Sequence, residues 1–147
     1  MLTQGQKNYL SKLSKERAES KITVRPYNPK TKIFADKTID KIKQVIPEAD
    51  IRFMGASALG ISGQNDVDIY ILSKKTAKEN YISILKIYFG RQTKNKWHWF
   101  EDGVEISVYL SDTEDYKFQE QLEIFEIFKN NPEILKEYEV LKKSMNG

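Results

Sequence analysis

The chain has 147 residues, 39% of them hydrophobic and 31% charged, which is typical of one folded globular domain rather than a disordered chain. It has no cysteine, which excludes disulfides, zinc–thiolate sites and thiol nucleophiles. The formal net charge of +3 comes from mixed signs along the chain. The most basic stretch, residues 91–97, is therefore interpreted as a solvated loop rather than a nucleic-acid-binding patch.

No apolar run approaches the roughly 20 residues that a membrane-spanning helix needs, and the first residues lack the apolar segment of a signal peptide. We therefore expect a cytoplasmic protein without membrane contact. Because no repeat, low-complexity tract or linker interrupts the chain, we predict one domain over residues 1–147, with residues 1–20 as an N-terminal helical extension.

The first half of the chain predicts two helices and two strands. Apolar residues at helical spacing predict a short helix over residues 4–17, and a short strand follows over residues 21–29, where prolines stop it. An amphipathic helix is expected over residues 31–46, before Pro47, and residues 50–55 form a strand. The apolar side of that helix is expected to consist of Ile33, Phe34, Ile39, Ile42 and Ile46.

The second half of the chain also predicts helices and strands. Residues 66–72 have strand periodicity, and residues 76–90 form a helix that Gly90 ends. Residues 96–110 are expected to form a hairpin, because Asp102–Gly103 separates two alternating runs.

Two C-terminal helices are expected over residues 114–131 and 132–145, the second beginning at Pro132. The elements together predict an α+β fold, with a small mixed or antiparallel sheet, helices mainly on one face, and the C-terminal helices added.

A loop rich in glycine and serine joins the strand at 50–55 to the strand at 66–72. Its glycines allow positive φ angles and close approach of a ligand to the backbone, and backbone N–H groups in such a turn form an anion cradle. We expect the nucleotide-contacting residues to be Gly55, Ala56, Ser57 and Gly60.

Two aspartates follow this loop, one residue apart. Asp66 and Asp68 face the same side of their strand, about 6–7 Å apart along it, and they repel each other unless a cation lies between them. Mg²⁺, or Mn²⁺ in its place, is the natural partner, because it prefers oxygen ligands shared with phosphates. The alternative is a solvated strand edge without a ligand.

A third carboxylate, Glu105, lies on the polar face of the later strand. If the two strands are neighbours, the three acids converge on a metal site. Such a site can transfer NMP from an NTP to a hydroxyl by in-line attack and release pyrophosphate. The acceptor is unidentified, whether a protein, an RNA end or a small molecule. The alternative is a non-catalytic nucleotide- or partner-binding module on the same fold.

At these residues the sequence resembles the DNA polymerase β-like nucleotidyltransferase superfamily. Gly55 resembles the signature glycine, Asp66 and Asp68 the paired metal ligands, and Glu105 the third acid. The resemblance implies a nucleotidyltransferase-like palm, metal-dependent transferase activity and binding of ATP or another NTP.

Within that superfamily the sequence is similar to the GrpB family, in three segments. They are the loop at 54–60, the triplet Tyr27, Asn28 and Pro29, and the C-terminal set Pro132, Tyr138, Leu141 and Lys142. Two positions depart from the pattern. Ala56 replaces the signature serine, so a hydroxyl is missing, and Phe125 stands where an arginine is usual.

Several other residues have two interpretations each. His98 is a candidate base or phosphate contact, but a lone histidine in a hairpin is more often structural or surface-exposed. Trp97, Trp99 and Phe100 can stack a nucleobase, although at least one tryptophan is expected in the core. The remaining candidates, for triphosphate contacts and for lining the cleft, are Lys74, Lys75, Arg91, Lys96, Tyr70 and Tyr109.

Overall fold

The computed structural model of the protein describes Gln4, Asn8 and residues 24–144. The expected helix over residues 4–17 and the extension over residues 1–20 lie almost entirely outside these residues. The described elements follow in the order α2 (Lys30–Val45), β1 (Asp50–Met54), α3 (Ala56–Leu59), β2 (Val67–Ser73), α4 (Lys78–Phe89), β3 (Lys96–Glu101), β4 (Val104–Asp112), α5 (Tyr116–Asn130) and α6 (Pro132–Ser144). None of the helices in this described part is long and apolar enough to cross a membrane.

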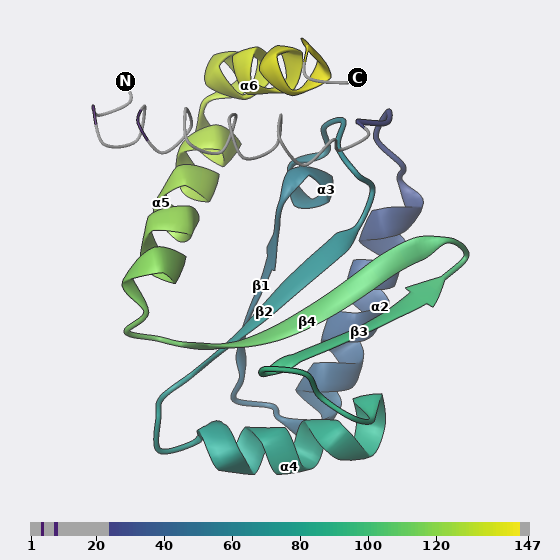
Figure 1. Cartoon of the computed structure of the whole chain (residues 1–147), viewed down its shortest axis with the longest axis vertical. Coiled ribbons are helices and arrows are strands. Elements are labelled where there is room, and N and C mark those ends of the chain that lie inside the picture. The colour runs from purple at the N-terminus through teal and green to yellow at the C-terminus, as the bar shows by residue number, and fades with distance from the viewer. Residues whose placement is uncertain (1–3, 5–7, 9–23, 145–147) are drawn as a thin grey trace.

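The four strands form one mixed sheet in the order β1–β2–β4–β3 (Figure 1). β1 pairs with β2, and β3 with β4, in antiparallel fashion, whereas β2 and β4 are parallel. Parallel neighbours need a crossover, which α4 and β3 provide between β2 and β4. The fold is α+β, as expected, and the two strands expected to carry the acids are neighbours.

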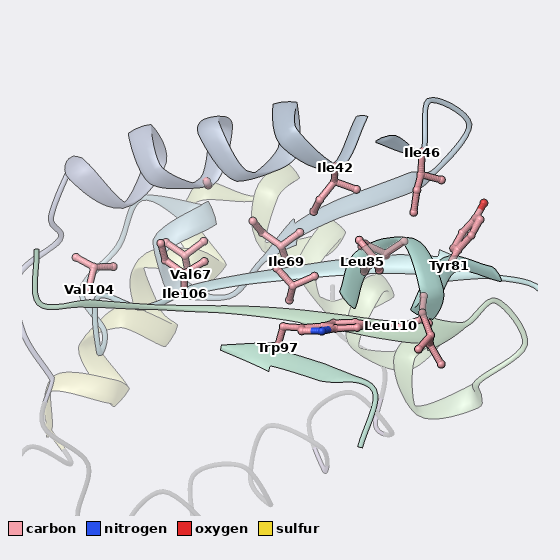
Figure 2. Close-up of a cluster of buried hydrophobic side chains, with 14 residues drawn as sticks. Ile42, Ile46, Val67, Ile69, Tyr81, Leu85, Trp97, Val104, Ile106 and Leu110 are labelled. Atoms are coloured by element: carbon pink, nitrogen blue, oxygen red, sulfur yellow. The ribbon is translucent and has the colours of Figure 1, made fainter. Parts of the chain in front are cut away.

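One face of the sheet is apolar and forms the core. Because side chains alternate along a strand, every second residue of β2 and β4 points to this face, and those residues are almost fully buried. Helices α2 and α4 cover them, and Figure 2 shows their side chains meeting those of the strands. The main contributors are Ile42 and Ile46 of α2, Val67, Ile69 and Ile71 of β2, Leu85 of α4, Trp97 of β3, and Ile106, Val108 and Leu110 of β4.

Helix α2 forms where the sequence predicts it. Ile42 and Ile46 are buried and Phe34 and Ile39 pack against the core, as expected, but Ile33 does not belong to the buried side. Ile33 is 64% exposed. The buried residues recur every three or four positions and include small and hydroxyl-bearing side chains: Thr31, Ala35, Thr38 and Ile42. Thr38 is accommodated because its hydroxyl donates to the Phe34 carbonyl at 2.8 Å. Small residues therefore let the helix approach the sheet closely, and the bulky Ile33 faces solvent.

The strand expected over residues 21–29 is wrong in its described part. Only Arg25 pairs there, in an isolated antiparallel bridge with Gly63. Pro26 follows directly, and because proline has no N–H it cannot extend a ladder. The segment is instead a tether that crosses the Gly/Ser loop and leads into α2.

The hairpin of β3 and β4 turns at Asp102–Gly103, as predicted. Both residues have positive φ, 49° and 76°, which is the backbone of a type I′ turn. Trp97 is only 1% exposed, so the expectation that one tryptophan belongs to the core is confirmed.

The two C-terminal helices are also confirmed, and α6 begins at Pro132. Helix α5 starts with Asp115, whose side chain accepts a hydrogen bond from the Lys117 N–H. Phe118 of α5 packs against Tyr70 of β2, with ring centroids 5.1 Å apart. Because Tyr70 points away from the core, α5 stands over the opposite face of the sheet from α2 (Figure 1).

Candidate active site

The polar face of the sheet holds side chains of β2 and β4 in register. Asp68 pairs with Ser107, and Tyr70 pairs with Tyr109. The two tyrosine rings stack, with centroids 4.7 Å apart and planes at 15°. Both tyrosines thus share the polar face with the acid, as the strand periodicity predicts.

Asp66 and Glu105 occupy the next position along the same two strands. Each precedes one member of the paired residues Val67 and Ile106, so they are neighbours across the parallel pair. Both line one small cavity. Within the part of the chain that the structure describes, no three acidic or histidine side chains are grouped so that they could hold a metal ion. The acids are therefore adjacent, without forming a ready-made three-ligand site.

Asp68 has the most perturbed carboxyl group of the site. Burial, together with the negative charges of Asp66 and Glu105, raises the pKa of Asp68 from 3.8 to about 7. The Tyr109 hydroxyl, which donates to Asp68 Oδ1 at 3.4 Å, and the positive charge of Lys96 oppose this rise. The carboxyl thus lies where an added positive charge would strongly favour its ionised form.

Gly55 brings the backbone of the Gly/Ser loop against Asp68. Its φ of 90° and ψ of −176° lie in a region that is essentially restricted to glycine. A Cβ atom at this position would be 3.4 Å from Asp68 Oδ2. Met54, just before it, pairs with Asp68 across β1 and β2. The glycine therefore has two functions, to make the turn and to leave room beside the carboxylate.

A cavity of about 230 Å³ opens beside this contact. Gly55, Ala56 and Asp68 line its sheet side, and α5 and α6 contribute a largely apolar and aromatic wall. That wall consists of Gln121, Ile124, Phe125, Phe128 and Tyr138. Phe128 and Tyr138 stack with centroids 4.6 Å apart, which joins the two helices at the cavity.

The four loop residues expected to contact a nucleotide differ in position. Gly55 and Ala56 line the cavity, whereas Ser57 is buried and Gly60 forms the C-cap of α3 with a left-handed φ of 71°. Ser57 is not among the residues that line the cavity. Backbone N–H groups remain the donors that this loop can offer to a ligand.

Comparisons with known proteins place the fold. A scan against protein families finds no match, and no curated protein matches the chain. Among solved structures, the conserved protein GrpB from Enterococcus faecalis matches with a TM-score of 0.63 and 15% sequence identity, over 83% of this chain and 81% of that one. This chain has a GrpB-like fold. At that identity, the likeness is one of architecture.

The segments that carry the sequence resemblance to GrpB meet around the Gly/Ser loop. Asn28, in the segment Tyr27–Asn28–Pro29, donates its N–H to Asn65 Oδ1 at 3.0 Å. The Asn65 side chain in turn donates to the Pro26 carbonyl at 2.7 Å, and its φ is 55°. Asn65, the residue just before Asp66, thus joins the segment that precedes α2 to the Gly/Ser loop. The GrpB-like segments are distant in sequence but contiguous in space.

Helix α6, which carries the last of these segments, contacts the same loop. Glu139 Oε2 accepts a hydrogen bond from the Ser62 N–H at 2.7 Å, and this bond lowers the pKa of Glu139. Lys142 is only 2% exposed, and its Nζ lies 5.3 Å from the Tyr138 ring centroid. A Cβ on Gly63 would be 3.3 Å from Lys142 Nζ and 2.7 Å from the Ala56 Cβ, so only glycine fits there.

The remaining candidates divide between the polar face and other surfaces. His98 is exposed, and it pairs with Ser107, so it lies on the same face as Asp68. Lys96 lies over the Tyr109 ring at 5.1 Å. Trp99 stacks on Phe89 of α4, on the core side. Lys74, Lys75 and Arg91 line neither of the two cavities beside the acids.

Two residues that sequence reasoning left aside also line these cavities. Arg25 lines the small cavity together with Asp66 and Glu105, and Tyr138 lines the larger one. Arg25 stands two residues before Tyr27 in the GrpB-like segment, and Tyr138 is part of the C-terminal set. Proximity to those motifs was the only sequence signal, since neither residue belongs to the acid motif itself.

Proposed function

We propose that the protein is a metal-dependent nucleotidyltransferase that moves NMP from an NTP to a hydroxyl acceptor. The observation that carries the proposal is the meeting of three acids with the glycine loop. Asp66 directly precedes β2, Asp68 lies on β2 and Glu105 on the adjacent β4, while Gly55 lies beside Asp68 and lines the same cavity. The GrpB-like fold is consistent with it.

The charge of the site supports a divalent cation. Asp66 and Glu105 already raise the pKa of Asp68, and a cation would relieve that repulsion. Mg²⁺ is usually held by one or two carboxylates plus substrate phosphates, so a complete protein cage is unnecessary. Asp66 and Asp68 would hold it, with Glu105 beside them. Such an ion stabilises charge on the transferred phosphoryl group and lowers the pKa of a bound hydroxyl.

The proposed nucleotide-binding site is the cavity of about 230 Å³ beside Gly55 and Asp68. Gly55 and Ala56 present backbone to the phosphates, and the wall from α5 and α6 offers aromatic rings to the base. Phe125 contributes an apolar surface to that wall, at the position where GrpB sequences usually have an arginine. The base is therefore held by stacking and burial more than by charge.

The chemical step needs an attacking oxygen, an acceptor for its proton and a leaving group. The acceptor hydroxyl oxygen forms a bond to the α-phosphorus while the bond from that phosphorus to the α,β-bridging oxygen breaks. Pyrophosphate leaves with the bridging oxygen. We assign the hydroxyl proton to a carboxylate oxygen of Glu105, the acid on the strand farther from the nucleotide loop.

The test combines labelling with a mutant cycle. The protein is incubated with each α-labelled NTP, Mg²⁺ and cell extract, and both labelled products and pyrophosphate are measured. Asp66→Ala and Asp68→Ala should each lose at least about 100-fold in activity, and the double variant should be little worse, because the acids act as one unit. Asp36→Ala, an exposed aspartate on α2, is the control and should keep full activity. Retained activity in Asp68→Ala would contradict the proposal.

A nucleotide- or partner-binding module without catalysis is the second candidate. Ala56 favours it, because the signature hydroxyl is missing and Ser57 is buried. The grouping of the acids also favours it, since the described residues contain no three-ligand cluster. Metal-dependent NTP binding by the purified protein, with neither pyrophosphate release nor labelling of any extract component, would support the module over the enzyme.

A further inference from the structure

Two cavities that differ in chemistry lie beside the acids. Asp68 lines the larger one, with the glycine loop and the aromatic wall. Asp66 and Glu105 line a second cavity of about 180 Å³. Its other lining residues are Arg25, Gln64, Asn65, Phe100 and Gly103. These residues come from the segment before α2, the loop before β2, and the β3–β4 hairpin with its turn.

In-line transfer needs one site for the nucleotide and another for the acceptor, because the incoming oxygen approaches the phosphorus opposite the leaving group. We propose that the second cavity binds the acceptor, and that the acceptor is a small hydroxyl compound with a phosphate or carboxylate group. This inference rests on the proposed function, since it assigns the nucleotide to the larger cavity.

Arg25 selects the charge of the acceptor. The Arg25 side chain is exposed at the cavity, and among the described residues it forms no ion pair. With the proposed cation held by Asp66 and Asp68, Arg25 is the positively charged side chain that this cavity would offer to an anion. A guanidinium binds phosphate and carboxylate through two parallel hydrogen bonds, which fixes orientation as well as charge.

The backbone of Arg25 is held in place, so its side chain starts from a defined point. Its N–H donates to the Gly63 carbonyl at 2.7 Å, and its carbonyl accepts from the Gly63 N–H at 3.0 Å. Asn65 binds the next residue, Pro26, through the carbonyl. Arg25 is thereby tied to the same loop that leads into Asp66, and it is not an independent surface arginine.

Phe100 and the cavity size limit the body of the acceptor. Phe100 is 66% exposed, and it pairs with Glu105 across β3 and β4. Its ring offers an apolar surface to the carbon skeleton of a ligand beside the acids. The cavity of about 180 Å³ is the smaller of the two cavities beside the acids, the other being about 230 Å³. A compact acceptor therefore fits better than a large one.

The test uses three acceptor probes that share a three-carbon hydroxylated skeleton and differ in their anionic group. Transfer of labelled AMP from ATP is measured with glycerol, glycerate and glycerol 3-phosphate. We expect kcat/KM at least tenfold higher for one of the two anions than for glycerol, and the better anion identifies phosphate or carboxylate as the group bound. Arg25→Gln should reduce that ratio to near one. Lys41→Gln, which removes an exposed cation of α2 that lines neither cavity, should keep the wild-type ratio.

A binding measurement separates failure of this inference from failure of the proposed function. Calorimetry follows glycerol 3-phosphate and glycerate binding in the presence of Mg²⁺ and an ATP analogue with an α,β-methylene bridge. Transfer without an anion preference, or with a preference that Arg25→Gln keeps, overturns the inference and leaves the function intact. Arg25-dependent anion binding without transfer supports the anion site and contradicts the function. Neither transfer nor binding overturns both.

Discussion

At the scale of single residues, Asp68 is the residue whose carboxylate is shaped both by the neighbouring backbone and by nearby charges. Gly55 leaves its carboxylate uncovered on one side, Tyr109 donates to it on another, and Asp66 and Glu105 repel it. The folded protein therefore carries an unfavourable charge at this position when no cation is present. Function and stability are expected to oppose each other here, as they commonly do at sites that store charge.

The raised pKa of Asp68 makes stability depend on pH in a defined direction. Between 3.8 and about 7 the folded state keeps the proton on Asp68 and the unfolded state has lost it. Stability contributed by this group therefore falls as pH rises through that window, and it is lowest above pH 7. In EDTA, Asp68→Asn should melt a few degrees above the wild type at pH 8, and the difference should shrink toward pH 4.

Thermal melts at several pH values check this, with Asp36→Asn as the matched control. Asp36 is exposed on α2, so its neutral variant should show no such pH-dependent gain. A gain for Asp68→Asn that is the same at pH 4 and pH 8 would show that titration of this carboxyl is not its cause.

At the scale of elements, α6 is a brace for the loop that carries the site. Glu139 holds the Ser62 N–H, and Lys142 packs beside Gly63, one helix turn away on the same side. The loop has little regular structure between α3 and β2, so its position depends on these contacts and on the bridge to Arg25. An element at the end of the chain thus positions residues near its middle.

Removing the Glu139 contact should destabilise the protein measurably. Glu139→Ala should lower the free energy of unfolding by about 1–2 kcal/mol, toward the low end for a hydrogen bond to a charged group because the side chain is partly exposed. Urea denaturation at pH 7 measures it. Since the pKa of Glu139 is lowered in the folded state, its contribution is present above the unfolded pKa of 4.5 and is lost as pH falls through the folded value.

Glu137→Ala is the matched control on the same helix. Glu137 is exposed, and its removal should change the free energy of unfolding by less than about 0.5 kcal/mol. Equal losses in the two variants would mean that helix propensity, and not the bond to Ser62, accounts for the effect.

At the scale of the whole molecule, the sheet has one face for the core and one for the site. Helices α2 and α4 cover the first, while α5 and α6 cover only part of the second and leave the two cavities beside the acids. Binding of ligand to this face adds contacts that exist only in the folded state, so it stabilises the fold as a whole.

Ligand binding should therefore raise the melting temperature. Mg²⁺ with ATP should stabilise the wild type in proportion to the logarithm of ligand concentration, by about 2.7 kcal/mol at 100 times the Kd. The double variant Asp66→Asn with Asp68→Asn should lose this shift and be at least as stable as the wild type in EDTA. The exposed pair on α2, Asp36→Asn with Asp40→Asn, should keep the shift. A double variant at 66 and 68 that melts much lower in EDTA would indicate a structural role for the aspartates.

The sequence predicted most elements and which side chains share the polar face of each acid-bearing strand. Strand alternation placed Asp68, Tyr70 and Tyr109 on one face, and Asp102–Gly103 located the hairpin turn. It failed where tertiary contacts override local pattern. Ile33 was expected in the core from helical spacing, but close packing of α2 on the sheet selects Ala35 and Thr38 instead.

What the sequence alone determined is what depends on neighbours along the chain. Periodicity, turn residues and the spacing of the glycine loop before Asp66 and Asp68 are local properties, because each follows from backbone geometry over a few residues. Only the tertiary structure decided which distant residues join them. The bridge of Arg25 to Gly63 and the contact of Glu139 with Ser62 join residues 38 and 77 positions apart, and the wall of α5 adds further distant residues. Such contacts arise from packing of whole elements, which no local pattern encodes.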